Sequence, residues 1–247
     1  MCGRFVVATA PEDLADLFHV HTIGDDLPRP SFNVAPTDRV PIVLDARPKG
    51  ENSAEPPVRR LESARWGLVP GWAGDVKIGI TAFNARIESA ADKPHFRSAV
   101  AKRRAILPAT GYYEWRTLDG TKVPYFIHLP GGELTLFAGL YEWWRDPARA
   151  DDDPQRWLLS ASVLTRESGG ALNDIHDRMP VFLHPDLIDE WLDPAERGGR
   201  QLLEEISARG AEQAQRMQFH EVDRSVGNVR NNSPLLTQPL TSTPGSQ

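Results

Sequence analysis

Short runs of apolar, aromatic and β-branched residues, separated by turn residues, dominate the chain between residues 58 and 145. Runs of this length and composition predict β-strands rather than long helices. Similar runs flank this region on both sides. The segments expected to form strands are RVPIVLDA, RRLESARWGLV, RRAILP, GYYEWR, VPYFIHL, ELTLFAGLYEWW, WLLSASVL and MQFHEVDRSV. The pattern therefore predicts a protein built around β-sheet.

Helical patterns are shorter and fewer. In TAPEDLADLF, Thr9 is the expected N-cap, Pro11 lies in the first turn and Glu12 completes a capping box. SAADKPHFRSAV is expected to be helical in part, with Pro94 interrupting it. HPDLIDEWLD and ERGGRQLLEEISARG predict two surface helices, of which the second is started or broken at its glycine pair and closed by Gly210.

These elements predict one α+β domain with a largely antiparallel, barrel-like β core and peripheral helices. No internal repeat and no long linker divides the chain, so the domain is expected to span residues 1–232. RPKGENSAEPP predicts an exposed connection between two strands. Residues 233–247 lack periodicity, which predicts a flexible C-terminal tail.

Composition and charge narrow the function classes. The chain has 247 residues, 40% of them apolar, a net charge of −6 and a pI near 5.7. Proteins that bind nucleic acid through bulk electrostatics are usually basic, so any such role here depends on a local basic cluster. The basic residues nearest to the candidate reactive motifs are Arg4, Arg86, Arg178, Arg224, Arg230, Lys102, Arg103 and Arg104.

The chain shows no apolar run long enough to span a bilayer and no signal peptide. A single cysteine precludes an internal disulfide, and the seven histidines are too scattered for a structural zinc site. We expect a cytoplasmic monomer without metal or cofactor.

The one cysteine, Cys2, follows the initiator methionine. Removal of Met1 would leave a free α-amine beside a thiol. An α-amine with a pKa of about 7.7–8.0 is neutral on the order of a few hundred times more often near pH 7 than a lysine with a pKa of about 10.4. Such a pair can close a thiazolidine ring on an aldehyde, or attack an amide with the amine as base. A buried, unreactive cysteine is the alternative.

Three other motifs carry candidate groups. FNARIES places Asn84 and Arg86 on one face of an extended segment, although Asn84 also suits a turn. GYYEWR surrounds Glu114 with aromatic residues, which would raise its pKa unless it pairs with Arg116. NDIHDRMPV places His176 on a loop before a strand, as either a reactive or a structural histidine.

The motifs MCGRF, SFNVAPT, WGLVPGW, FNARIES, RRAILPATGYYEW, IHDRMPVFL and VGNVRNN occur in this order over residues 1–232. The chain thereby resembles the SOS response-associated peptidase (SRAP) family of abasic-site processing proteins. The resemblance implies a DNA-damage response protein that crosslinks the N-terminal cysteine to the ring-opened aldehyde of an abasic site in single-stranded DNA. It implies a thiazolidine product, an autopeptidase that releases Met1, and a lyase side activity.

By this resemblance Cys2 is the nucleophile, Asn84 orients the cysteine and the sugar, Glu114 moves protons and His176 is the general acid that opens the sugar. The DNA contacts that it implies are Arg4, Asn33, Trp72, Arg86, Trp115 and Arg178. Replication-fork proteins are the expected partners, and the nucleoid is the expected location of the crosslinked protein. The chain departs from the family pattern at Ala73, Ala105 and Thr110.

Three other classes remain as alternatives. An N-terminal-nucleophile amidohydrolase or glutaminase also begins with Met-Cys-Gly, and it would release ammonia from glutamine. A module that binds DNA without a covalent bond would tolerate a blocked N-terminal amine. A metal-binding or structural module has little support beyond the HVH motif at residues 19–21.

Overall fold

The structure is a computed structural model that describes residues 2–47 and 56–240. Most of the predicted connection RPKGENSAEPP lies outside the described residues. Five strands close into a barrel, in which β5, β4, β7, β10 and β11 follow one another through four antiparallel pairings. A parallel pairing of β5 with β11 completes the ring. The barrel strands are β4 (Arg39–Ala46), β5 (Val58–Trp66), β7 (Arg104–Ala109), β10 (Thr135–Arg145) and β11 (Trp157–Glu167).

Three short strands extend the barrel sheet. They are β2 (Thr22–Ile23), β6 (Asn84–Arg86) and β12 (Arg178–Pro180). β2 pairs parallel with β5, while β6 and β12 pair with β11, β6 parallel and β12 antiparallel. The second sheet is wholly antiparallel, with the order β13–β9–β8–β1–β3. Its strands are β1 (Phe5–Val7), β3 (Ser31–Val34), β8 (Gly111–Leu118), β9 (Thr121–His128) and β13 (Gln218–Glu221).

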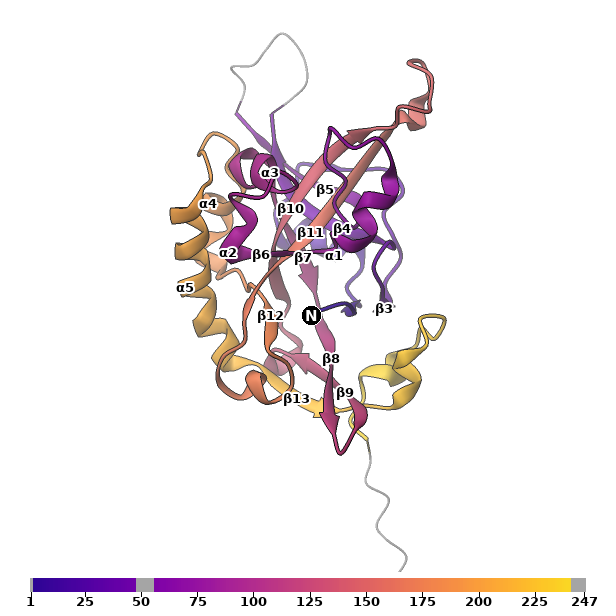
Figure 1. Cartoon of the computed structure of the whole chain (residues 1–247), viewed down its shortest axis with the longest axis vertical. Coiled ribbons are helices and arrows are strands. Elements are labelled where there is room, and N and C mark those ends of the chain that lie inside the picture. Colours follow the sequence, from indigo (N-terminus) through magenta and orange to yellow (C-terminus); the bar gives the residue numbers. More distant parts are fainter. Residues whose placement is uncertain (1, 48–55, 241–247) are drawn as a thin grey trace, which may run out of the picture.

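The helices lie outside the two sheets. They are α1 (Pro11–Leu17), α2 (Ile87–Ala90), α3 (Arg97–Lys102), α4 (Ile188–Leu192) and α5 (Arg200–Arg216). The short 3-10 helices are η1 (Val76–Thr81), η2 (Pro130–Gly132), η3 (Pro154–Arg156), η4 (Gly170–Asp174), η5 (Pro185–Leu187), η6 (Arg224–Gly227) and η7 (Pro234–Thr237). Figure 1 shows α2, α4 and α5 along one side of the sheets and α1 on the other side. The predicted α+β domain with a barrel-like core is confirmed.

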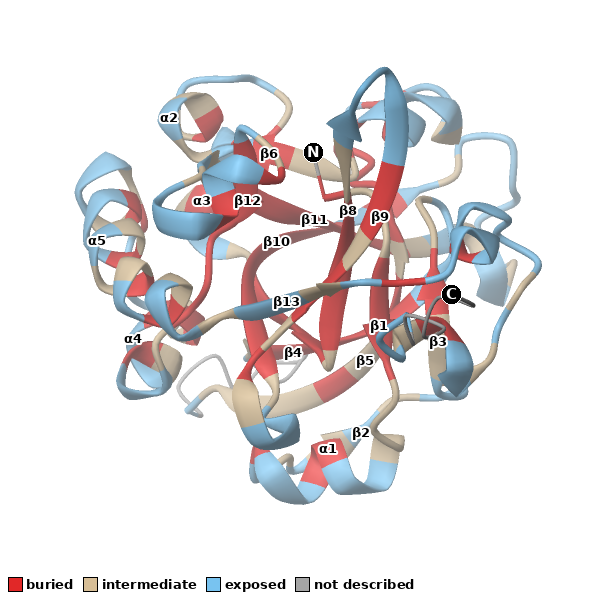
Figure 2. Cartoon of the chain, turned by 90° about the horizontal axis from the view of Figure 1, so that it is seen from below, coloured by how far each residue is buried: buried red, intermediate tan, exposed pale blue. Residues whose placement is uncertain are grey.

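The first strand joins the two sheets because both of its faces are buried. Phe5 packs edge-on against Trp66 and Phe137 of the barrel, with ring centroids 4.7 and 5.8 Å apart. Val6 points the other way into a smaller cluster with Tyr113. Alternate residues of a strand point to opposite faces, so β1 is fixed from two sides. Figure 2 shows these central strands as buried, with the exposed residues on the periphery.

Two predicted helix ends are wrong. Thr9 is not the N-cap of α1, because the helix begins at Pro11 with Ala10 as its N-cap and no side-chain cap. Gly210 does not end α5, which continues to Arg216. At Gly210 the helix approaches the main chain of Phe182 so closely that a Cβ atom would lie 2.2 Å from the Phe182 carbonyl oxygen. Glycine therefore serves packing here and not helix termination.

Other boundaries agree with the sequence. The segment around Pro94 is interrupted, since α2 ends at Ala90 and α3 begins at Arg97. The glycine pair precedes α5, with Gly199 as the N-cap. The predicted tail is wrong at its start, because Pro234–Thr237 forms a 3-10 turn and buries Leu236. Residues 241–247 lie outside the described part of the chain.

Candidate active site at the first strand

Main-chain hydrogen bonds hold the beginning of the chain against β8. Tyr113 N donates to the carbonyl of Arg4 at 2.9 Å, and Thr110 N donates to that of Val6 at 2.8 Å. The Thr110 hydroxyl also accepts a hydrogen bond from Ala8 N at 3.0 Å. The departure from the family pattern at Thr110 therefore adds a side-chain contact to this strand. These bonds fix the position of Cys2, three residues before β1.

Cys2 is fully buried. Asn84 Nδ2 donates to the Cys2 carbonyl oxygen at 2.7 Å. Burial raises the pKa of the thiol well above its usual value, the nearby Glu114 carboxylate raises it further, and the Arg4 amide opposes this with a hydrogen bond. The sulfur is therefore held as a neutral thiol near pH 7, and its reaction requires a neighbouring base.

Asn84 reaches Cys2 from the opposite side, on β6. This short strand pairs parallel with β11, with Asn84 opposite Val163. Its neighbour Ala85 is buried, while Arg86 is exposed. The Oδ1 atom of Asn84 is buried and has no hydrogen-bond partner within the described residues. An unpaired buried acceptor is costly, which makes this atom a candidate for binding a donor group of a ligand.

Glu114 lies on β8 and is 4% exposed. Burial raises its pKa from 4.5 to about 7. The alternative partner Arg116 forms no ion pair with Glu114 in the described part of the chain. The predicted rise in pKa is thus confirmed, and a carboxyl group that titrates near neutrality can both accept and donate a proton.

His176 lies on the loop between η4 and β12, as predicted, and is about 29% exposed in its side chain. Its Nδ1 atom is 3.0 Å from Arg178 N and 2.8 Å from Asp177 Oδ1. The Arg178 amide can donate to Nδ1 of the neutral ring, and the Asp177 carboxylate can accept from Nδ1 when that atom carries a proton. Burial lowers the pKa of His176. The neutral ring therefore predominates at pH 7.

Sequence reasoning missed two neighbours of these groups. Tyr112 is fully buried, and burial together with the charges of Cys2 and Glu114 raises its pKa well above 10.0. Its position two residues before Glu114 on a strand was a signal that both side chains share a face. Lys122, on the paired strand β9, lowers the pKa of His176. No pattern in the sequence indicated that contact.

The residues expected to contact DNA divide into buried and exposed groups. Trp72 is 63% exposed, and Arg86 is exposed at the start of α2. Arg4 is half-buried, donates to Asn33 Oδ1 and to the Val226 carbonyl at 2.8 Å each, and lies 5.7 Å from the ring of the half-buried Trp115.

Asn33 is 3% exposed, and its Nδ2 atom donates to carbonyls of the segment from residue 226 to residue 231 at 2.8–3.3 Å. Its amide therefore joins β3 to that segment.

Arg178 is also buried, at 8% exposure. Its guanidinium binds both carboxylate oxygens of Glu88 at 2.8 and 3.0 Å, and the Thr165 carbonyl at 2.7 Å. The ion pair of Arg178 with Glu88 joins β12 to α2. β12 follows His176 in the chain, and α2 follows Asn84. Arg178 thus connects the two segments that carry reactive groups.

Two basic residues close to the Glu114 strand in sequence also bind other groups of the protein itself. Arg103 pairs with Glu142 at 2.6 Å. Arg104 is 1% exposed and donates to five main-chain carbonyls. These two arginines do not contribute to a basic surface.

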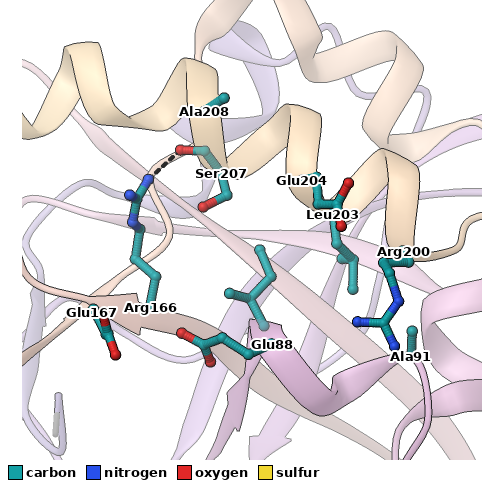
Figure 3. Close-up of a pocket in the computed structure, with 10 residues that line it drawn as sticks. Glu88, Ala91, Arg166, Glu167, Arg200, Leu203, Glu204, Ser207 and Ala208 are labelled. Carbon is teal, nitrogen blue, oxygen red and sulfur yellow. Dashed lines mark hydrogen bonds between the residues drawn. The ribbon is translucent and has the colours of Figure 1, made fainter.

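A groove with a volume of about 490 Å³ lies elsewhere, between α2, β11 and α5. Figure 3 shows Glu88, Arg166 and Arg200 on its walls, with Arg166 donating to the Ser207 carbonyl. It contains neither Cys2 nor the groups around it.

Within the described residues no cluster of three or more His, Cys, Asp or Glu side chains is arranged to hold a metal ion. The helices of the described part are too short or too polar to cross a membrane.

Comparison with known proteins adds to this geometry. A family model described as SOS response associated peptidase (SRAP) matches residues 1–229. "Abasic site processing protein YoqW" of Bacillus subtilis is 35% identical over 240 residues, which cover 96% of this chain and 99% of the relative. "Abasic site processing protein YedK" of Escherichia coli is 32% identical over 244 residues, covering 97% and 100%.

A crystal structure of a protein from Bacteroides thetaiotaomicron superimposes with a TM-score of 0.75. It is 22% identical, and the alignment covers 97% of this chain and all of the other. This similarity supports the fold.

Proposed function

Because the chain belongs to the SRAP family, as its ordered motifs indicated, we propose that it processes abasic sites in DNA by capturing them covalently at Cys2. The observation that carries the proposal is the convergence on Cys2 of two groups from distant strands. Asn84 holds its carbonyl, and a buried carboxyl group with a pKa of about 7 adjoins its thiol. The relatives whose names describe abasic-site processing support the substrate class.

The reaction begins once Met1 has been removed, which frees the α-amine of Cys2. His176 donates a proton to the ring oxygen as the abasic sugar opens to its aldehyde. The amine then attacks the aldehyde carbon, and loss of water leaves an imine. Positioned amine and thiol groups make the next step intramolecular, which favours ring closure.

Ring closure adds the thiol across the carbon–nitrogen double bond. Sulfur bonds to carbon, the nitrogen gains a proton, and the product is a thiazolidine. The high pKa of the Cys2 thiol means that a base must take its proton, and Glu114 is suited to take this proton and return it to nitrogen. The reverse sequence would release the DNA.

The unpaired Oδ1 atom of Asn84 can accept a hydrogen bond from the amine or from a sugar hydroxyl. This gives Asn84 two functions: Nδ2 orients the cysteine and Oδ1 orients the reactant. The same thiol and carboxyl would assist release of Met1 in an autopeptidase step. Elimination from the imine before ring closure would give strand cleavage as a lyase side reaction.

Single-stranded DNA would be held by Arg86 and Trp72, the two exposed members of the predicted contact set. Stacking of a base on a tryptophan contributes about 1–3 kcal/mol and does not depend on sequence. Arg4 and Trp115 lie deeper and would line the position of the missing base. Asn33 and Arg178, being buried, support the site from behind.

The test is intact mass spectrometry of the full chain after incubation with abasic or undamaged single strands. We expect loss of Met1 and an adduct that forms only with the abasic strand, corresponding to condensation with loss of one water. Cys2→Ala should abolish the adduct, and Cys2→Ser should give at most a labile imine with strand nicking. An adduct that persists in Cys2→Ala, or ammonia release from glutamine by the wild type, would contradict the proposal.

A further inference from the structure

Two arginines oppose each other at one end of the β4–β5 ladder. Arg39 and Arg65 are direct partners in the antiparallel register. Side chains at such positions share a face, with Cβ atoms about 4.5–5.5 Å apart, and like charges there destabilise a sheet. At the other end of the ladder Asp45 opposes Arg59, and the two form an ion pair at 2.9 Å. The like-charged pair is therefore an exception in a ladder that elsewhere matches its charges.

Within the described residues no carboxylate relieves this repulsion. In residues 2–47 and 56–240, neither guanidinium lies within 4 Å of a carboxylate. Arg39 Nη1 donates to the Ser63 hydroxyl at 3.3 Å, and Arg65 Nη1 contacts the Gly67 carbonyl at 3.4 Å. Burial lowers the pKa of Arg65. By contrast, six arginines of α5 and the β10–β11 connection have carboxylate partners: Arg145, Arg149, Arg156, Arg200, Arg209 and Arg216.

The face that carries the pair also carries the loop with Trp72. Ser160 on β11 is the register partner of Arg65, and paired residues of parallel strands share a face. The Ser160 hydroxyl accepts a hydrogen bond from Val69 N at 2.9 Å, so the loop after β5 packs on this face. Trp72 projects from that loop into solvent with 63% exposure. A flat stacking surface and two uncompensated cations thus lie on one side of the barrel.

Arg39 is also the chain neighbour of Asp38, which lies near Arg4 of the candidate active site. Burial lowers the pKa of Arg4, and the negative charge of Asp38 partly offsets this. The Asp38 carboxylate accepts a hydrogen bond from Ala35 N at 2.9 Å within its own turn and makes no ion pair with Arg39. Arg39 is thus one residue from a side chain that acts on Arg4, and Arg65 shares its face with the loop that carries Trp72.

We propose that Arg39 and Arg65 form a phosphate subsite that binds the backbone of the DNA strand beside the captured nucleotide. The inference rests on the proposed function and deepens it, since it states where the strand flanking the lesion runs. A backbone phosphate between the two guanidiniums would supply the negative charge that the ladder lacks, through charge-assisted hydrogen bonds. The strand would then continue toward Trp72, where a base can stack.

The first experiment measures non-covalent binding of an undamaged thymidine oligonucleotide to the full chain by fluorescence anisotropy at increasing salt. Each phosphate neutralised in a single strand adds about 0.7 to the slope of log K against log salt, so loss of the one phosphate held between the two guanidiniums lowers the slope by about 0.7. Between about 50 and 200 mM NaCl, wild-type affinity should fall about 2.6-fold more than that of Arg39→Gln/Arg65→Gln.

Two controls separate charge from folding. Arg39→Lys/Arg65→Lys keeps both charges and should keep most of the wild-type slope. Arg60→Gln removes an arginine of the same strand that is already paired with Glu62, and it should leave the slope unchanged. The Gln variant should melt no lower than the wild type, because it removes a repulsion. An unchanged slope in the Gln variant, or an equal loss in the Arg60→Gln control, overturns the subsite.

The second experiment compares capture of abasic strands that have flanks on both sides of the lesion with strands that end at the lesion on one side. The Gln variant should slow capture several-fold when the flank that reaches the subsite is present, and not when it is absent. Equal slowing for all strands overturns the subsite. If the wild type captures no abasic strand, the proposed function fails, while the slope measured with undamaged DNA still decides whether the subsite exists.

Discussion

The carboxyl group of Glu114 offers the sharpest test of the site, because its burial has consequences for stability as well as for chemistry. The side chain is 4% exposed, and burial raises its pKa from 4.5 to about 7. Glu114→Gln replaces it with a neutral group of nearly the same shape. The variant therefore removes the ionisation while it keeps the side-chain volume at this buried position.

The direction in which stability depends on pH follows from proton binding. Because the pKa is higher in the folded state, the folded protein binds more protons than the unfolded chain between about pH 4.5 and pH 7. Stability contributed by this group therefore falls as the pH rises through that window and stays constant above it. Each pKa unit corresponds to about 1.4 kcal/mol, so the cost is below about 1 kcal/mol at pH 5 and roughly 3 kcal/mol at pH 8.

The assay is urea unfolding of the wild type and Glu114→Gln at pH 5 and pH 8. We expect the variant to be more stable at both pH values, with an advantage about 2.5 kcal/mol larger at pH 8. Glu205→Gln, a change at an exposed position of α5, is the matched control and should show no such difference. If the advantage of Glu114→Gln changes by less than about 0.5 kcal/mol between the two pH values, the carboxyl group is not desolvated and its assignment as a proton carrier near neutrality loses its basis.

Three further changes test other parts of the molecule. Asn84→Asp removes the donor to the Cys2 carbonyl and adds a negative charge, so capture of abasic strands should slow at least about tenfold in quenched time courses, with little change in affinity for undamaged DNA. Arg178→Ala should destabilise the protein by about 3 kcal/mol in urea, whereas Glu88→Gln, at an exposed carboxylate, should cost only about 1 kcal/mol. Arg104→Met leaves five carbonyls without their donor and should lower the free energy of unfolding by roughly 3 kcal/mol or more, while the folded fraction keeps its capture rate. Equal stability of variant and wild type would contradict the stabilising role of this buried cation.

Local patterns predicted the strands well, since side chains along a strand alternate between two faces whatever the strand packs against. The alternation in GYYEWR placed Glu114 among buried aromatic side chains, and its high pKa follows directly from that burial. Pro94 interrupted its helix because proline lacks the donor that a helix interior requires. The wrong predictions concerned the ends of helices. Gly210 was expected to end α5 but lies inside it, where the main chain of Phe182 approaches closely.

The sequence by itself determined the residue types of the reactive set, their order and the strands that carry them. Only the tertiary structure decided which arginines are available to a ligand. Arg178 and Arg86 looked equivalent along the chain, yet Arg178 is buried against Glu88, 90 residues away, and Arg86 is exposed. Arg39 and Arg65 acquired their significance only when two strands paired in a particular register. The reason is physical: strand and helix patterns depend on neighbours along the chain, whereas burial and charge compensation depend on groups that folding brings together from distant segments.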